Sequence, residues 1–195
     1  MSELRNLAHR HSIAIAGSYL AKMEGQNFNR GFFINPNGKT LYYNKKHLFG
    51  LSNESKLLAA GNDSPLLVEY HGWKIAIVVC YDLRFPVWCR YGNGGACYDM
   101  LVVVANWPCS RQYAWEHLLI ARAIENQAIV VGANRSGSDE FGIYDNMSRV
   151  YDELGSKING TDRELVKIVE LNIGDHKEKR SRWPILNDAD QFSVQ

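Results

Sequence analysis

The chain has 195 residues, 46% of them hydrophobic, which is enough for one compact domain with its own core, and we predict a single domain over residues 1–195. Its 22 basic and 21 acidic residues leave a formal net charge of +1, so no strong field favours nucleic acid or an anionic membrane as a partner. No apolar run approaches the roughly 18 residues of a membrane span, and the first residues lack a signal-peptide pattern, so we expect a cytoplasmic protein.

The first quarter of the chain predicts a helix followed by an antiparallel meander. Tight turns join three successive strands, and the second turn contains the Asn-Gly pair typical of hairpins. The predicted elements are the last turns of a helix at Leu4–His9, strands at Ser12–Lys22, Gly31–Asn35 and Thr40–Tyr43, and turns at 25–27 and 36–39.

The remainder predicts a mixed α/β domain. Residues 45–65 have no clear period, and a loop of that length within a compact domain is often functional. A continuous apolar run at Tyr98–Ala105 is typical of a strand covered on both faces. The other predicted elements are a hairpin of Leu66–Tyr70 and Lys74–Val79, a helix at Arg111–Gln127, strands at Ala128–Ala133, Ser148–Asp152 and Glu164–Asn172, and a short helix at Ile173–Ser181.

Cys80 ends an apolar strand, and two interpretations compete for it. A cysteine in that position is more often an inert small hydrophobe than a nucleophile. The polar turn from Tyr81 to Pro86 changes the balance, because a turn after a strand exposes the side chain at the strand's end. The backbone N–H groups of such a turn can face a developing oxyanion, and a nearby cation lowers the pKa of a thiol.

A cysteine nucleophile needs a partner, and the sequence offers more than one. Six histidines are present, but no spacing singles one out, so a Cys–His enzyme is a minor hypothesis. Lys45 and Lys46 follow a strand, where two lysines are usually a solvated face. Because they open the long polar loop, one ammonium could enter a cleft there, with Glu54 to orient it.

Several strings, taken together and in order, resemble the nitrilase or carbon–nitrogen hydrolase superfamily, and within it the omega-amidase type. The strongest are CYDLRFP at Cys80–Pro86, YNKKHLF at Tyr43–Phe49 and ARAIENQ at Ala121–Gln127. Supporting strings are GSYLAK at 17–22, FNRGFF at 28–33, VANWPCSR at 104–111, GANRSG at 132–137 and RWPILNDADQF at 182–192. Each string alone is weak, but the ordered set spans nearly the whole chain.

The resemblance implies an α-β-β-α sandwich and a Glu–Lys–Cys triad that hydrolyses an amide through a thioester. Carried over by position, Cys80 is the nucleophile, and Lys45 rather than Lys46 holds the oxyanion together with the backbone N–H of Tyr81. Glu54 matches an additional glutamate that positions the lysine or the substrate. No metal or organic cofactor is implied, and the expected partners are a small amide substrate and further copies of the chain, as a dimer or larger assembly.

The resemblance also suggests roles for residues around the pocket. Trp107 and Arg111 are expected to border it, and an arginine suits the carboxylate of a 2-oxo acid because it pairs in a bidentate manner. Arg84 is a second candidate for that role, although a structural ion pair with Asp82 or a neighbouring loop is favoured for it. Trp107 has the alternative of being a core residue.

The chain departs from the family pattern at its amino-terminal side. The general-base glutamate of the family precedes the strand that matches Ile13–Leu20, and neither Glu3 nor Glu24 occupies its position. We therefore interpret the fold as an amino-terminally truncated sandwich in which the first strands and the triad glutamate are absent. Loss of a general base typically costs about 100- to 10,000-fold in rate, so reduced or lost activity is expected.

Three functions follow as alternatives. The leading one is an omega-amidase that hydrolyses 2-oxoglutaramate or a similar 2-oxo acid amide. The second is another family member, such as a carbamoylase or a nitrilase proper. The third is a binding module of a different class, a pseudoenzyme that keeps the pocket without turnover.

Overall fold

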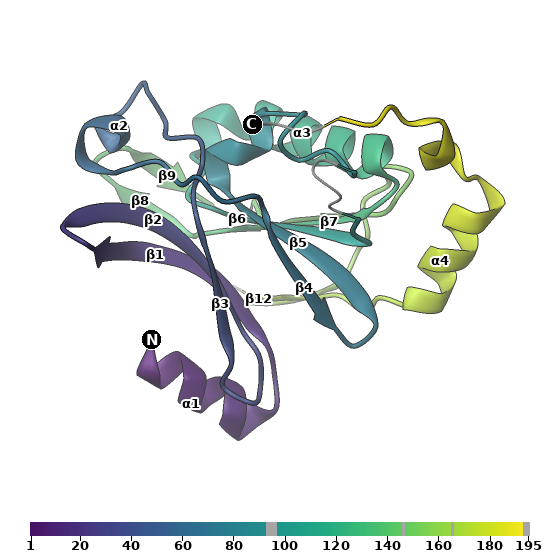
Figure 1. The fold of residues 1–195 in the computed structure, drawn as a ribbon, viewed down its shortest axis with the longest axis horizontal. Coiled ribbons are helices and arrows are strands. Elements are labelled where there is room, and N and C mark those ends of the chain that lie inside the picture. Colours follow the sequence, from purple (N-terminus) through teal and green to yellow (C-terminus); the bar gives the residue numbers. More distant parts are fainter. Residues whose placement is uncertain (93–96, 146, 165, 193–195) are drawn as a thin grey trace.

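Two sheets form the centre of the computed structural model, which describes residues 1–92, 97–145, 147–164 and 166–192. The sheets lie face to face, with helix α1 (Ser2–His11) beside one and helix α3 (Gln112–Asn126) over the other (Figure 1). The predicted order of layers, helix–sheet–sheet–helix, is confirmed.

The first sheet is the predicted meander. It has the order β1-β2-β3, and both pairs are antiparallel. Alternate residues of the middle strand face opposite sides: Phe33 packs toward the second sheet, whereas Phe32 and Ile34 pack with Ala8 of α1. The strands are β1 (Ile15–Met23), β2 (Gln26–Ile34) and β3 (Thr40–Asn44).

The second sheet has five strands in the order β10-β7-β6-β5-β4. Its central strands β5, β6 and β7 are parallel, so their carboxyl ends meet at one edge of the sheet. The outer pairs are antiparallel. The strands are β4 (Leu66–Tyr70), β5 (Trp73–Val79), β6 (Met100–Ala105), β7 (Ile129–Asn134) and β10 (Arg149–Tyr151).

Helix α3 covers the outer face of this sheet because its apolar residues recur at helical spacing. Trp115, Leu119 and Ala123 are fully buried and share a core with β5, β6 and β7. The helix ends at Gln127, which adopts a left-handed conformation (φ 43°) and donates its N–H to the carbonyls of the last turn.

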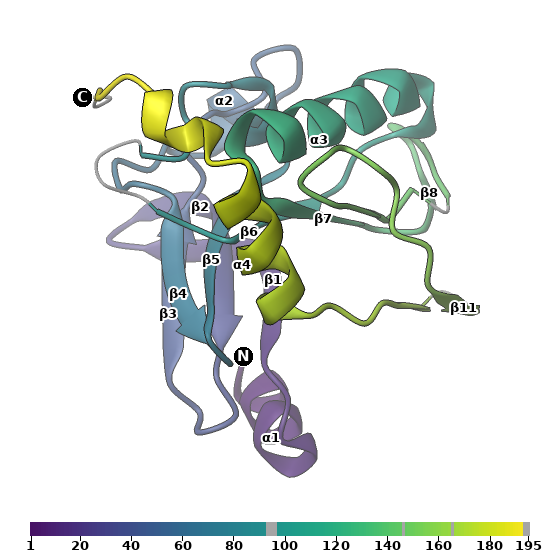
Figure 2. The same ribbon diagram turned by 90° about the vertical axis from the view of Figure 1, so that its right-hand side faces the viewer.

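The predictions for the carboxy-terminal part of the chain are confirmed for its helix but not for the length of its strand. Helix α4 (Ile173–Arg182) is confirmed and packs beside the five-stranded sheet (Figure 2). The strand predicted at Glu164–Asn172 is only β12 (Val166–Ile168), paired with β11 (Thr161–Arg163) in a separate hairpin. Both strands are largely exposed. Their apolar residues therefore form no buried face from which the bounds of a strand could be predicted.

Several short elements were not among those predicted. Residues 45–65 contain one helical turn, α2 (Glu54–Leu57), and a small hairpin follows β7. The remaining elements are the 3₁₀ turns η1 (Cys80–Arg84), η3 (Cys109–Arg111) and η4 (Ile185–Asp188) and the strands β8 (Gly137–Asp139) and β9 (Gly142–Tyr144).

Candidate active site

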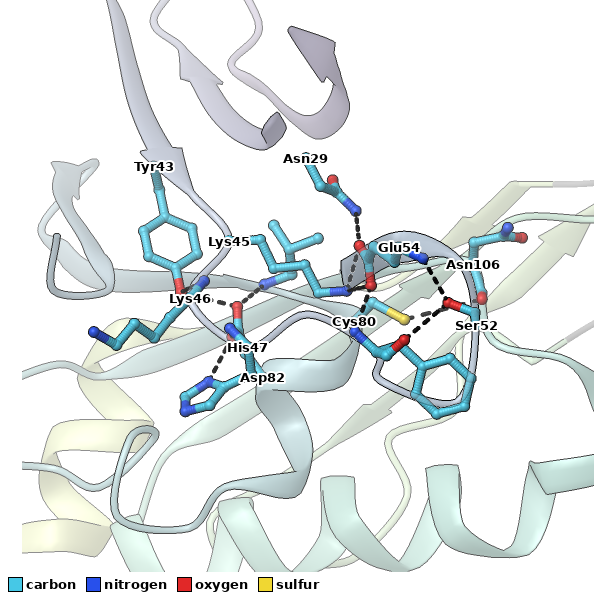
Figure 3. A network of polar contacts seen from close by, with 12 residues as sticks. Asn29, Tyr43, Lys45, Lys46, His47, Ser52, Glu54, Cys80, Asp82 and Asn106 are labelled. Carbon is cyan, nitrogen blue, oxygen red and sulfur yellow. Dashed lines mark hydrogen bonds and ion pairs between the residues drawn. The ribbon is translucent and has the colours of Figure 1, made fainter. Parts of the chain in front are cut away.

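Cys80 stands at the carboxyl end of β5, where the chain leaves the sheet and begins η1. Its backbone is in the left-handed region (φ 48°), which is unfavourable for a residue with a side chain. Backbone strain of this kind is common where a side chain is held out of a sheet for chemistry. The Sγ–H group points to the carbonyl oxygen of Asn106, 3.9 Å away, in the loop after β6 (Figure 3).

Lys45 follows β3 and is turned inward. Its side chain is only 2% exposed, and its Nζ donates to both carboxylate oxygens of Glu54, at 2.8 and 2.6 Å. Lys46 points elsewhere: its Nζ lies 5.8 Å from the centre of the Trp88 ring, away from Cys80 (Figure 3). Of the two adjacent lysines, only Lys45 therefore reaches the candidate site.

The Glu54 carboxylate is held by several donors. Besides Lys45, the amide of Asn29 donates at 3.1 Å and the backbone N–H of Phe49 at 2.7 Å. Burial raises the pKa of the Glu54 carboxyl, but the hydrogen bond and charge of Lys45, with the Phe49 and Asn29 donors, bring it below its usual value. Glu54 is thus an ionised, fully occupied acceptor that orients Lys45.

The loop that carries these groups is tied back to the first sheet. Lys45 donates its N–H to the Asn29 carbonyl at 2.9 Å and accepts from the Gly61 N–H at 2.8 Å. Gly61 passes so close to β3 that a Cβ there would overlap the backbone carbonyl of Asn44, with the carbonyl carbon 2.6 Å away. A glycine at position 61 therefore permits the close approach that closes the loop around Lys45.

The Lys45 ammonium and the Cys80 sulfur lie close enough together for the lysine charge to act on the thiol (Figure 3). Burial raises the pKa of the Cys80 thiol above its ordinary value, and the Lys45 charge lowers it in part. The carboxylates of Glu54 and Asp82 act in the opposite direction. Both accept hydrogen bonds from other groups, so neither is arranged as a free proton acceptor for the thiol.

Asp82 and His47 are two residues of the site that the sequence did not single out. The Asp82 side chain is fully buried and accepts from the Tyr43 hydroxyl and from His47. Of the two partners expected for Arg84, Asp82 or a neighbouring loop, the pairing with Asp82 is wrong, because these donors already occupy the carboxylate. The Arg84 guanidinium instead lies 4.9 Å from the centre of the Trp107 ring, which holds it by a cation–π contact.

Trp107 lies mostly in the core, 3% exposed, against Trp115. Its backbone is clamped by Asn134 at the end of β7, whose side chain accepts from the Trp107 N–H at 2.7 Å and donates to its carbonyl at 2.8 Å. Its indole N–H donates to the carbonyl of Arg111 at 3.0 Å. The structure therefore places Trp107 as a support for the Arg111 loop.

Arg111 and Tyr81 border the same site. The Arg111 guanidinium is 4.8 Å from the centre of the Phe49 ring, in the loop that also carries Lys45 and Glu54. The Tyr81 ring packs edge-on against Phe49 at 5.0 Å, and its backbone N–H directly follows the nucleophile candidate. Within the described ranges, no carboxylate forms an ion pair with Arg111, so its charge is available to a ligand.

Two kinds of feature are absent from the described residues. Among the described residues, no group of three or more His, Cys, Asp or Glu side chains is placed to hold a metal ion. In those residues, no helix is long and apolar enough to cross a membrane. All four cysteines are free thiols.

The fold and this Cys–Lys–Glu cluster define a hydrolase of the type that the sequence strings resemble. Residues 1–180 match the carbon–nitrogen hydrolase family, and the chain belongs to that family. It is 42% identical over 190 residues to the omega-amidase YafV of Escherichia coli K12, a match covering 96% of this chain and 73% of that protein.

Two further comparisons agree with this family assignment. The chain is 33% identical over 191 residues to the 2-oxoglutaramate amidase of Bacillus subtilis, covering 96% of this chain and 73% of the relative. Among solved structures, the carbon–nitrogen hydrolase XC1258 of Xanthomonas campestris superposes with a TM-score of 0.86 at 38% identity, covering all of this chain and 76% of that one.

Proposed function

We propose that this chain hydrolyses the terminal amide of a small 2-oxo acid, of the 2-oxoglutaramate type, through a thioester on Cys80. The single observation that carries the proposal is the convergence of a buried ammonium, Lys45, and a thiol, Cys80, beside a chain turn. The names of the Escherichia coli and Bacillus subtilis relatives supply the substrate class.

The proposed reaction assigns a role to each group. The Cys80 sulfur attacks the amide carbon, and the carbonyl oxygen gains negative charge. The Lys45 ammonium and the Tyr81 N–H stabilise that charge, and Glu54 keeps Lys45 in place. The C–N bond then breaks, ammonia leaves with the proton lost by the thiol, and water cleaves the thioester to release the acid and restore the thiol.

Substrate selection is assigned to the Arg111 side of the site. A guanidinium recognises a carboxylate through two parallel hydrogen bonds, and Arg111 lies against the loop that holds Lys45. Trp107 contributes by fixing the Arg111 backbone through its indole N–H. Arg84, stacked on Trp107, is the second candidate for the substrate carboxylate.

The direct test is ammonia release from 2-oxoglutaramate by the purified chain and by its Cys80→Ser variant. Turnover that disappears in the variant supports the hydrolase. A mass increase of one acyl group on Cys80 without turnover indicates a chain that acylates but does not deacylate. No modification of Cys80 by any amide or electrophile contradicts the proposal and favours a binding pseudoenzyme. Ammonia release from carbamoyl or nitrile substrates alone indicates another member of the family.

We also propose that the chain forms a dimer or larger homo-oligomer and works in the cytoplasm. Four free thiols suit a reducing compartment. Exposed apolar side chains near the nucleophile turn and near the carboxy terminus, among them Val87 and Trp183, suit an interface. Light scattering after size-exclusion chromatography tests the assembly, and a monomer at micromolar concentration contradicts it.

A further inference from the structure

The Asp82 carboxylate joins the two segments that carry the proposed nucleophile and oxyanion-binding lysine. It is 0% exposed and accepts four hydrogen bonds. Oδ1 accepts from the backbone N–H of His47 at 3.0 Å and from its Nδ1–H at 2.8 Å. Oδ2 accepts from the Tyr43 hydroxyl at 2.9 Å and from the Val79 N–H at 3.1 Å.

The donors to Asp82 lie next to the proposed nucleophile and on both sides of the proposed oxyanion-binding lysine. Val79 immediately precedes Cys80, whereas Tyr43 and His47 lie two residues before and two residues after Lys45. One carboxylate therefore fixes the end of β5 relative to the start of the loop after β3, which carries Lys45 (Figure 3).

Two neighbours hold this arrangement rigid. The Tyr43 hydroxyl accepts from the Trp88 indole at 3.0 Å and from the Lys46 N–H at 3.2 Å, so its own proton is directed to Asp82. Burial raises the pKa of Tyr43 far above its usual value, which keeps the hydroxyl a donor. The His47 ring is stacked on Phe85 with centroids 3.8 Å apart, which aims its Nδ1 at the carboxylate.

We propose that Asp82, with His47 as its side-chain donor, is a positioning pair that sets the placement of Lys45 relative to Cys80. The pair touches neither reacting atom and acts through the backbone on either side of them. This inference rests on the proposed function for its kinetic readout, but its effect on the thiol is measurable without any amide substrate.

A matched pair of variants isolates the Nδ1–H bond. In His47→Asn the side-chain NH₂ lies close to where Nδ1 stands and can still donate to Asp82, whereas in His47→Gln the amide reaches the Nε2 position. Both variants lose the stacking on Phe85, so their difference reports the hydrogen bond. We expect kcat of His47→Gln to be about 10- to 100-fold below that of His47→Asn, with KM within about threefold, because one bond to a buried charge is lost.

The second readout is alkylation of Cys80 by iodoacetamide across a pH series, followed at this residue by peptide mass spectrometry. The charged groups that bear on this thiol are Lys45, Glu54 and Asp82. If Lys45 is displaced, the alkylation midpoint moves to higher pH in His47→Gln but not in His47→Asn. Asp82→Asn separates two causes: loss of its negative charge alone would lower the midpoint, whereas loss of positioning raises it.

The outcomes are distinct. Equal kcat values and equal alkylation profiles for His47→Asn and His47→Gln overturn the proposal, as does a lowered midpoint in Asp82→Asn. If the wild-type chain releases no ammonia, the proposed function fails while the alkylation series still decides the positioning pair. His11→Gln, an exposed change at the end of α1, serves as the control.

Discussion

At the scale of single residues, two adjacent lysines enter different surroundings. Lys45 is buried against Glu54, and Lys46 lies over the Trp88 ring. We expect Lys45→Ala to lower kcat for amide hydrolysis by about 100-fold or more, as removal of an oxyanion donor does, and Lys46→Ala to change it less than about fivefold. Ammonia release by the two purified variants, with their melting temperatures, measures this. Equal losses would reassign the oxyanion role.

The same lysine influences the reactivity of the thiol. Because the Lys45 charge lowers the pKa of Cys80, its removal raises that pKa, and alkylation of Cys80 at pH 7.5 slows. Lys46→Ala is again the matched control. Unchanged alkylation in Lys45→Ala would show that the ammonium and the sulfur do not interact in solution.

The sequence strings single out Cys80 and Lys45 as candidates, since each lies within a short segment whose letters resemble the family, and Glu54 follows as a candidate from the loop after Lys45. They did not identify Asp82 or His47 as partners, although both lie inside those same strings. A hydrogen bond between residues 35 positions apart depends on how two sheets pack, which local spacing does not encode. The same reason explains the wrong pairing of Arg84 with its near neighbour Asp82.

At the scale of elements, the loop from β3 to β4 depends on one close backbone approach. In Gly61→Ala the new Cβ overlaps the Asn44 carbonyl, so we expect a loss of about 1–3 kcal/mol in the free energy of unfolding and a displaced Lys45. Gly50→Ala, in the same loop, meets nothing within 4 Å and is the control. Urea unfolding and amidase assays of both variants test this; similar results for the two would contradict it.

Helix α4 is attached to the five-stranded sheet through a buried histidine. His176 is 2% exposed, with its Nδ1 3.4 Å from Glu153, its Nε2 4.0 Å from Asp99, and its ring beside Trp73. Burial lowers the pKa of His176, and the attraction of Glu153 does not fully restore it. The helix is therefore docked with a neutral imidazole.

This docking predicts a pH dependence of stability. The folded pKa of His176 lies below the unfolded value of about 6.5, so stability is complete above pH 6.5 and falls below it, by up to about 1.4 kcal/mol per pH unit. Urea unfolding at pH 7.5 and 5.5 should show a smaller loss in His176→Gln than in the wild type. His117→Gln, exposed on α3, should behave as wild type. An identical loss in all three chains would contradict the expectation.

At the scale of the whole molecule, the fold was predictable where elements have one buried face. The meander, the β4–β5 hairpin, the doubly covered β6 and helix α3 all follow the apolar pattern of the sequence, whereas helix α4 is mostly polar and buries only His176 among its residues. Short, exposed strands such as β8 and β11 lack that pattern. The strand order of the second sheet joins residues far apart in the chain, so it could be expected only from the family resemblance.

The left-handed backbone of Cys80 has a consequence for stability as a whole. A glycine fits that conformation without the steric cost of about 1–2 kcal/mol that a Cβ incurs. We therefore expect Cys80→Gly to melt at a temperature at or above that of Cys80→Ala, the reverse of the usual order in a regular element. A lower melting temperature for Cys80→Gly would show that the turn is not strained. If the order holds, the Cβ that any side chain at position 80 requires lowers the stability of the fold, and the remaining contacts of the chain offset this loss.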